Sequence, residues 1–196
     1  MPRLILVKHS LPEIVFDRPP SQWRLSAEGR RRCLTLASRL ASYYPARVIT
    51  SPEQKAYETA RRVSQKLGVP LLINDRIYEH RRDQVAYLPG EQFRQSVQQM
   101  MQRPELRVFG EESAAESLAR FSNAIWRLLE QFPSQTLVVV SHGTVISLFA
   151  AACCQLEPFE LWNRLGLPAY LVLRTPEMVM EDIVDRVTIE RMNLPV

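Results

Sequence analysis

Two short apolar runs, each leading directly to a histidine, constrain the fold of this sequence most strongly. Residues 4–7 lead through Lys8 to His9, and residues 137–141 lead to His142. Apolar runs of this length with turn residues close behind are typical of buried strands in a parallel sheet. Open α/β sheets bind ligands at the carboxyl ends of their strands, so both histidines are expected at one edge of the sheet.

Apolar residues at helical spacing separate the predicted strands. Residues 27–43 carry such a stripe behind Ser26, a residue type that favours helix N-caps. Ser51 is predicted to be the N-cap of a second helix, which Gly68 ends. The strand–helix–strand–helix–strand order predicts an α/β fold, a three-layer α/β/α arrangement with a mostly parallel central sheet. The predicted strands cover residues 4–9, 47–50, 71–74, 137–141, 170–174 and 187–191, and later helices cover residues 91–102, 113–131, 145–155 and 158–164.

The chain is expected to form a single domain over residues 1–196, since no repeat, low-complexity segment or linker divides it. Segment 75–112 breaks the strand–helix rhythm because it is polar, rich in glutamine and punctuated by Pro89, Gly90 and Pro104. A long insertion in an α/β domain is often a lid or a specificity segment. We interpret residues 75–112 as a lid-like insertion, with a surface excursion as the alternative.

The composition limits the class of partner. A net charge of +4 suits a small anionic substrate but is too small to predict nucleic-acid binding. The longest apolar stretch, residues 145–154, is shorter than the roughly 20 residues of a membrane-spanning helix, so no membrane partner is expected. Cys33, Cys153 and Cys154 give an odd count without metal-site spacing, and we interpret them as reduced and buried. These features predict a cytoplasmic protein.

The candidate site residues form a set suited to phosphate chemistry. His9 and His142 are expected at one sheet edge, with Lys55 in the first turns of a helix whose free N–H groups bind anions. Glu79 follows the third strand at the same edge, and the basic residues 80–82 follow it as either a second anion contact or a solvated charge run. A neutral imidazole is a nucleophile for phosphorus, nearby cations keep it unprotonated, and a carboxyl group can protonate the leaving oxygen.

Several segments in order along the chain resemble the histidine phosphatase superfamily, also called phosphoglycerate mutase-like. The resemblance covers most of the sequence, and it implies a phosphoglycerate mutase-like fold and a phosphatase that needs no cofactor and no metal. The segments that carry it are Lys8-His9-Ser10, Thr50-Ser51-Pro52-Glu53-Gln54-Lys55-Ala56 through Thr59-Ala60, Arg76-Ile77-Tyr78-Glu79, Gly110-Glu111-Glu112-Ser113 and Val140-Ser141-His142-Gly143.

The resemblance implies a role for each catalytic residue. His9 corresponds to the nucleophile that becomes phosphohistidine, and Glu79 corresponds to the proton donor. His142 corresponds to the second histidine, which hydrogen-bonds the phosphoryl oxygens. The implied activity is hydrolysis of a small phosphate monoester through a phosphohistidine intermediate.

The phosphate-binding positions depart from the family pattern. Lys8 and Lys55 stand where the family has arginines, and Ser10 stands where a glycine is usual. An arginine fork grips two phosphate oxygens while lysine is a point charge, so the pocket keeps its charge but loses geometric control. The Ser10 side chain either crowds the phosphate or donates a hydrogen bond to it.

Three other functions remain open. The first is phosphoglycerate mutase-type phosphotransfer, although the chain is short for a mutase of this family. The second is a catalytically impaired relative that binds an anion or a partner, which the lysine replacements favour. The third is a metal-dependent hydrolase with His9, His142 and Glu79 as ligands, although Lys8 would repel the metal.

Overall fold

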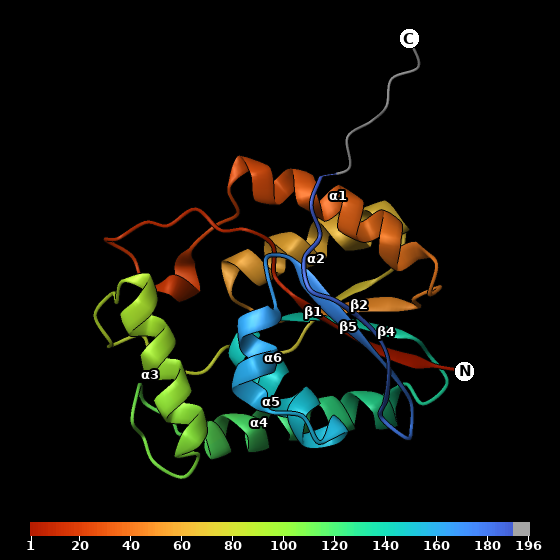
Figure 1. The fold of residues 1–196 in the computed structure, drawn as a ribbon. Coiled ribbons are helices and arrows are strands. Elements are labelled where there is room, and N and C mark those ends of the chain that lie inside the picture. The colour runs from red at the N-terminus through yellow and green to blue at the C-terminus, as the bar shows by residue number, and fades with distance from the viewer. Residues whose placement is uncertain (190–196) are drawn as a thin grey trace.

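The computed structural model describes residues 1–189, and within them six strands form one sheet in the order β3-β2-β4-β1-β5-β6 (Figure 1). β1, β2, β3 and β4 run parallel to one another, whereas β5 pairs antiparallel with β1 and with β6. The predicted mostly parallel central sheet is therefore confirmed. The strands are β1 (Arg3–Lys8), β2 (Arg47–Thr50), β3 (Leu71–Ile73), β4 (Leu137–Ser141), β5 (Ala169–Arg174) and β6 (Val179–Val184).

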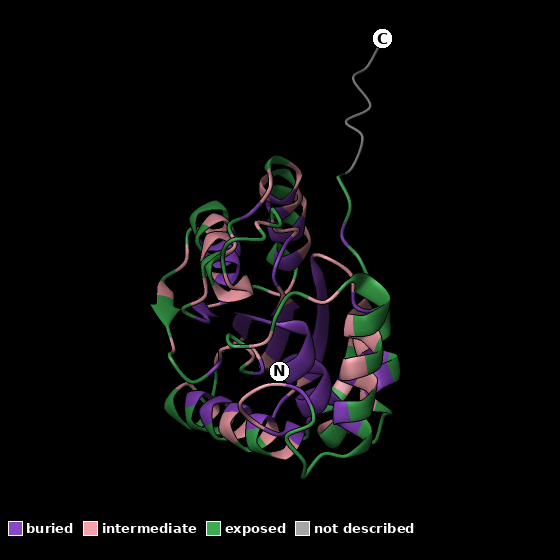
Figure 2. Cartoon of the chain, turned by 90° about the vertical axis from the view of Figure 1, so that its left-hand side faces the viewer, coloured by how far each residue is buried: buried purple, intermediate pink, exposed green. Residues whose placement is uncertain are grey.

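Helices cover both faces of the sheet and make it the middle of three layers. Figure 1 shows α1 and α2 over one face and α4 and α5 over the other, and Figure 2 shows the buried strands between helices with exposed outer faces. None of the helices within residues 1–189 combines the length and apolar character needed to cross a membrane. The helices are the short 3₁₀ helix η1 (Pro20–Gln22) and α1 (Ala27–Ala41), α2 (Gln54–Leu67), α3 (Gly90–Gln102), α4 (Ala114–Gln131), α5 (Gly143–Cys154) and α6 (Pro158–Arg164).

The alternation of side chains along β1 divides the core between the two faces. Leu4 and Leu6 belong to the cluster that α4 and α5 complete, while Ile5 and Val7 belong to the cluster that α1 and α2 complete. All four side chains are fully buried. A central strand buried on both faces requires a continuous apolar run, which is why residues 4–7 carry no polar side chain.

Serine side chains cap two helices, whereas the predicted serine cap of a third helix is wrong. Ser26 caps α1, and Ser113 caps α4 in a capping box with Glu116. Ser51, however, is not the N-cap of α2, because Glu53 holds that position. The Ser51 hydroxyl instead accepts a hydrogen bond from the backbone N–H of Glu53 at 3.3 Å, in the loop that precedes the helix.

The prediction of a last strand over residues 187–191 is also wrong. The final strand of the described region is β6, and residues 187–189 are irregular, while residues 190 and 191 lie outside the described residues. β6 pairs antiparallel with β5 at the edge of the sheet. Its side chains are only partly buried, so residues 179–184 lack the apolar run by which a central strand is recognised.

Segment 75–112 contains α3, which packs against α5 and α6 rather than on the central sheet. Val97 and Met100 of α3 form a third apolar cluster with Phe109, Leu148 of α5 and Phe159 of α6. This cluster fixes α3 beside the strand ends at which the two histidines lie (Figure 1). A lid-like role for the segment stays a prediction.

The cysteines have the form of free thiols, in two different environments. Cys33 is buried in α1, as expected, and burial raises the pKa of its thiol to about 11. Cys153 and Cys154 at the end of α5 are only partly buried, contrary to expectation. The C-terminal turn of α5 lies near the surface, since Leu156 just beyond it is exposed.

Candidate active site

The two histidines meet where neighbouring parallel strands end. β1 and β4 pair in register, with Val7 opposite Val140, and the backbone N–H of His9 donates to the Ser141 carbonyl at 3.0 Å. The rings of His9 and His142 lie edge to face, with centroids 5.3 Å apart. Residues 133 positions apart in sequence thus share one site because their strands are adjacent.

The backbone around His9 defines its tautomer. Nδ1 lies 2.8 Å from the Ser10 carbonyl oxygen, which can only accept, so Nδ1 carries the ring proton and Nε2 keeps its lone pair. Burial, followed by the charge of Lys55 and the proximity of His142, holds the pKa of His9 well below its usual value. His9 is therefore a neutral imidazole with an available Nε2 at neutral pH.

His142 is completely buried beside the loop that precedes α2. Its Nε2 lies 2.8 Å from the Ser51 hydroxyl and 3.4 Å from a Glu53 carboxylate oxygen. Its Nδ1 has no hydrogen-bond partner within the described part of the chain. Burial, then the charges of Lys55 and Arg82, hold its pKa well below the usual value, so this ring is neutral as well.

Glu53 is a site residue that the sequence interpretation missed. Its Oε2 accepts from the Lys55 ammonium at 2.5 Å, and its Oε1 accepts from the Glu79 backbone N–H at 2.8 Å. Burial alone would raise the pKa of Glu53, but the Lys55 charge and these hydrogen bonds lower it below its usual value. An ionised carboxylate thus lies among groups that would otherwise face a phosphate. The signal for Glu53 in the sequence was its position two residues before Lys55, at the N-cap of a helix.

Lys55 and Glu79 both lie at the predicted edge. Lys55 is 5% exposed, and its ammonium also donates to the Pro20 carbonyl at 2.7 Å. The Glu79 carboxylate accepts from the N–H groups of Thr144 and Val145 at 3.3 and 3.4 Å, in the first turn of α5. A carboxylate at a helix N-terminus is stabilised by the helix dipole. Glu79 is thereby held next to the start of the helix that His142 caps.

Lys8 and Ser10 are directed elsewhere by their hydrogen bonds. The Lys8 ammonium donates to the Leu165 carbonyl at 2.6 Å and lies 5.9 Å from the centre of the Trp162 ring. Burial lowers the pKa of Lys8 to about 8. The Ser10 hydroxyl donates to the Gly29 carbonyl at 2.8 Å. The structure therefore gathers His9, His142, Lys55 and Glu79, while these two side chains point to other partners.

The basic residues 80–82 do not form one solvated run. His80 is buried, and its Nε2 lies 2.7 Å from the Glu112 carbonyl, whereas Arg81 is exposed. Arg82 is partly buried, and its Nη1 has no hydrogen-bond partner among residues 1–189. A small cavity of about 150 Å³ lies at this point, with Arg82, Glu53, Lys55 and Glu79 in its wall.

The geometry does not favour the metal-hydrolase alternative. Within the described residues, no group of three or more His, Cys, Asp or Glu side chains is arranged to hold a metal ion. His9 Nδ1 is committed to a backbone carbonyl, and the Glu79 carboxylate is committed to backbone N–H groups. The buried Lys55 and the partly buried Arg82 supply positive charge at this site instead.

The family follows from a match over most of the chain. A family model of the histidine phosphatase superfamily (branch 1) matches residues 15–175, so this chain belongs to the histidine phosphatase superfamily. The matched region begins after His9 and includes Lys55, Glu79 and His142. Comparison with curated protein sequences finds no match.

Solved structures, two of which are phosphatases, share the fold. A mycobacterial glucosyl-3-phosphoglycerate phosphatase superposes with a TM-score of 0.76 at 18% identity, covering 93% of this chain and 98% of that chain. YhfR of Bacillus stearothermophilus gives 0.74 at 18% identity, covering 94% and 96%. A phosphoserine phosphatase of Entamoeba histolytica gives 0.73 at 16% identity, covering 94% and 97%. These likenesses confirm the phosphoglycerate mutase-like fold.

Proposed function

We propose that this protein is a phosphatase that hydrolyses a small phosphate monoester through a phosphohistidine on His9. One observation carries the proposal: Nδ1 of a buried, neutral His9 is bound to the Ser10 carbonyl, which leaves Nε2 as the nucleophilic atom. His142 lies beside it, and Lys55 and Arg82 supply positive charge. The phosphatases named above support hydrolysis as the reaction of this fold.

The proposed reaction has two steps. The first step starts with Glu79 protonated: His9 Nε2 attacks phosphorus, the bond from phosphorus to the ester oxygen breaks, and Glu79 gives its proton to the departing oxygen. In the second, the Glu79 carboxylate takes a proton from water, whose oxygen attacks phosphorus, and the bond from phosphorus to His9 Nε2 breaks to release inorganic phosphate. His142 and Lys55 stabilise the charge on the equatorial oxygens throughout. The enzyme returns to its starting protonation state after both steps.

A second candidate function is an anion-binding relative with impaired catalysis. The observation that favours it is the Glu53–Lys55 ion pair, since the cation expected to bind phosphate already has an internal carboxylate partner. The hydrogen bond from the Lys8 ammonium to the Leu165 carbonyl favours the same candidate, because it holds a second cation away from a phosphate. A phosphatase must open both contacts or work with the remaining cations.

A panel of phosphate esters separates the two functions. The panel includes phosphoserine and a phosphorylated glycerate, compounds of the kind for which the similar phosphatases are named. Release of inorganic phosphate by the wild type and its loss in His9→Ala support the phosphatase. Equal release by both proteins contradicts the role of His9. Binding of phosphate without release from any ester supports the anion-binding relative.

A further inference from the structure

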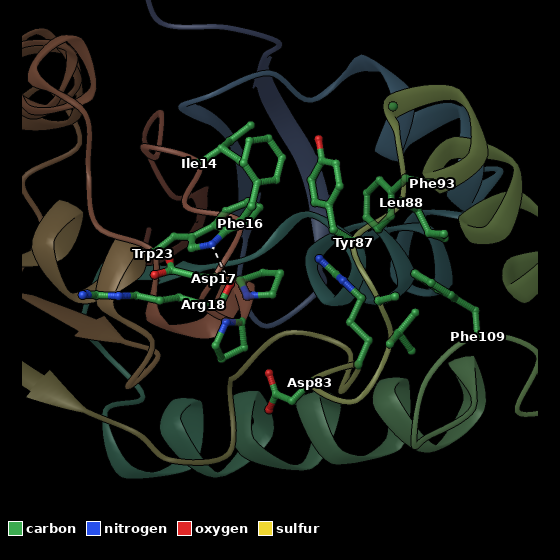
Figure 3. A pocket seen from close by; sticks show the side chains of 16 residues that line it. Ile14, Phe16, Asp17, Arg18, Trp23, Asp83, Tyr87, Leu88, Phe93 and Phe109 are labelled. Atoms are coloured by element: carbon green, nitrogen blue, oxygen red, sulfur yellow. Dashed lines mark hydrogen bonds between the residues drawn. The ribbon is translucent and has the colours of Figure 1, made fainter.

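We propose that the larger cavity beside the one lined by Lys55 and Glu79 binds the apolar, ring-bearing body of the phosphate ester, an inference that rests on the proposed function. The cavity has a volume of about 490 Å³, within the range of small-molecule sites. Loops from two distant parts of the chain form its walls, and Figure 3 shows their side chains facing one another. The residues that give it its apolar character are Ile14, Phe16, Trp23, Tyr87, Phe93 and Phe109.

Large apolar side chains are exposed at the mouth of this cavity. Phe16 is 73% exposed, and Ile14 and Tyr87 are about half exposed. Phe16 and Tyr87 meet edge to face across the two loops, with ring centroids 4.9 Å apart. Single exposed apolar residues are ordinary, but a group of them around one concave opening marks a ligand site. Their arrangement fits a flat ring better than a sugar or a short polar chain.

The apolar cavity adjoins the cavity that Lys55 and Glu79 line. Pro20, Arg82 and Asp83 line both, so the two cavities are neighbours. A phosphate beside Lys55 would place its ester body past Arg82. This adjacency favours a phosphate ester over a protein segment as the occupant.

Arg82 at the junction has the properties of a contact to the phosphate end. Its Nη1 is buried without a hydrogen-bond partner among residues 1–189, and buried guanidinium donors are normally satisfied. Its guanidinium lies 4.8 Å from the centre of the Phe93 ring and 6.0 Å from that of Phe109. The same side chain thus borders the apolar wall and offers a free donor to an anion.

The loop that carries Arg82 is fixed in place before any ligand binds. The Glu111 carboxylate accepts from the backbone N–H groups of Asp83 and Gln84 at 3.1 and 2.9 Å. The Ser21 hydroxyl donates to the Asp83 carboxylate at 3.0 Å and joins the two loops that face each other across the cavity. A preorganised wall binds a ligand with a smaller loss of conformational entropy.

The test compares 3-phenylpropyl phosphate with n-propyl phosphate. Both are esters of primary alcohols with the ring remote from the ester oxygen, so the chemistry at phosphorus is matched. Dissociation constants are measured by calorimetry on His9→Ala proteins, in which the esters are not hydrolysed, and kcat/KM is measured by phosphate release with His9 intact. We expect the phenyl compound to bind the protein with the unaltered cavity at least about 10-fold more tightly, from burial of the ring. This preference should fall towards one in the double variant Phe16→Ala/Tyr87→Ala and stay unchanged in Leu34→Ala, a control with an equally exposed apolar side chain on α1.

The outcomes for the cavity and for the proposed function are distinguishable. Equal affinity of the protein with the unaltered cavity for both esters overturns the cavity assignment, and so does a preference that survives in the double variant. A preference in binding without turnover of either ester supports the cavity and contradicts the phosphatase. Arg82→Gln should weaken the binding of both esters by the same factor, because Arg82 contacts the phosphate that they share. Loss of the phenyl preference in that variant contradicts the position given to Arg82.

Discussion

Replacing Glu53 with glutamine should tighten phosphate binding, although glutamate and glutamine have nearly the same shape. Glu53 is ionised, pairs with Lys55 at 2.5 Å and lies 3.4 Å from His142 Nε2. An incoming phosphate therefore meets a carboxylate that neutralises the cation meant to attract it. Glu53→Gln removes the negative charge and keeps an oxygen that can accept from the Glu79 N–H.

The size of the effect follows from the charges. Two unit charges 4 Å apart interact by about 4 kcal/mol at an effective dielectric constant of about 20. Measured couplings between close charge pairs begin near 1.5 kcal/mol, so we expect phosphate affinity to rise at least about 10-fold. The unliganded variant should be less stable than the wild type, since a buried Lys55 without its ion-pair partner typically costs about 3–5 kcal/mol. The single amide oxygen that accepts from the Glu79 N–H cannot also accept from Lys55, so the variant keeps no part of the Lys55 contact.

Calorimetry with inorganic phosphate measures the affinity, and thermal unfolding with and without phosphate measures the stability. Excess phosphate should raise the melting temperature of Glu53→Gln more than that of the wild type, because the tighter ligand stabilises the folded state more. Glu130→Gln on α4 is the control, since it makes the same change of net charge at an exposed position. Unchanged or weaker phosphate affinity in a folded Glu53→Gln would refute the view that this carboxylate competes with phosphate.

Three further predictions concern pH and packing. The Lys8 ammonium donates to the Leu165 carbonyl, but its charge still acts on His9 and His142, and its pKa is about 8. Wild-type kcat/KM should therefore decline above that pH, while Lys8→Arg keeps its charge and its activity; parallel pH profiles would show that the Lys8 charge does not contribute to the reaction. The pKa of His142 is lowered by burial, so the unfolded state takes up the proton first. The free energy of unfolding therefore decreases as the pH is lowered below about 6.5. His142→Gln should remove about 1.4 kcal/mol per pH unit from that slope in denaturant titrations, and an unchanged slope would show that the buried ring is charged. A Cβ on Gly29 would lie 2.1 Å from the Leu11 carbonyl oxygen, so Gly29→Ala should destabilise the fold by about 1–3 kcal/mol, while Gly90→Ala, with open space around it, should stay near wild type. Equal unfolding midpoints for the two alanine variants would contradict this packing argument.

The sequence was sufficient to predict a structural feature where a strong local pattern and a topological rule agreed. The apolar runs before His9 and Ser141 predict adjacent buried strands, and parallel strands end at one edge, so the meeting of His9 with His142 could be foreseen. Ser26 and Ser113 were recognisable as helix caps because their side-chain chemistry is local.

The remaining features depend on contacts between distant segments, which no local pattern encodes. β6 is an edge strand whose partly buried side chains give a weak apolar signal. Glu53 enters the site because the loop before α2 passes His142, and the sequence shows only a charged residue near a helix start. The Arg82 guanidinium lies beside the aromatic rings of residues 93 and 109, and one of its nitrogens is buried without a partner among residues 1–189. In the sequence, Arg82 is only the last of three basic residues.

Mapping the phosphoryl group on the enzyme tests the central claim most directly. The wild type is mixed with the ester that it hydrolyses fastest, quenched under mild alkaline conditions that preserve phosphohistidine, and digested for mass spectrometry. Our account predicts one phosphorylated site, His9 with the phosphate on Nε2, which is absent from His9→Ala. Phosphate on any other residue, or undiminished turnover without a phosphorylated enzyme, would contradict the mechanism.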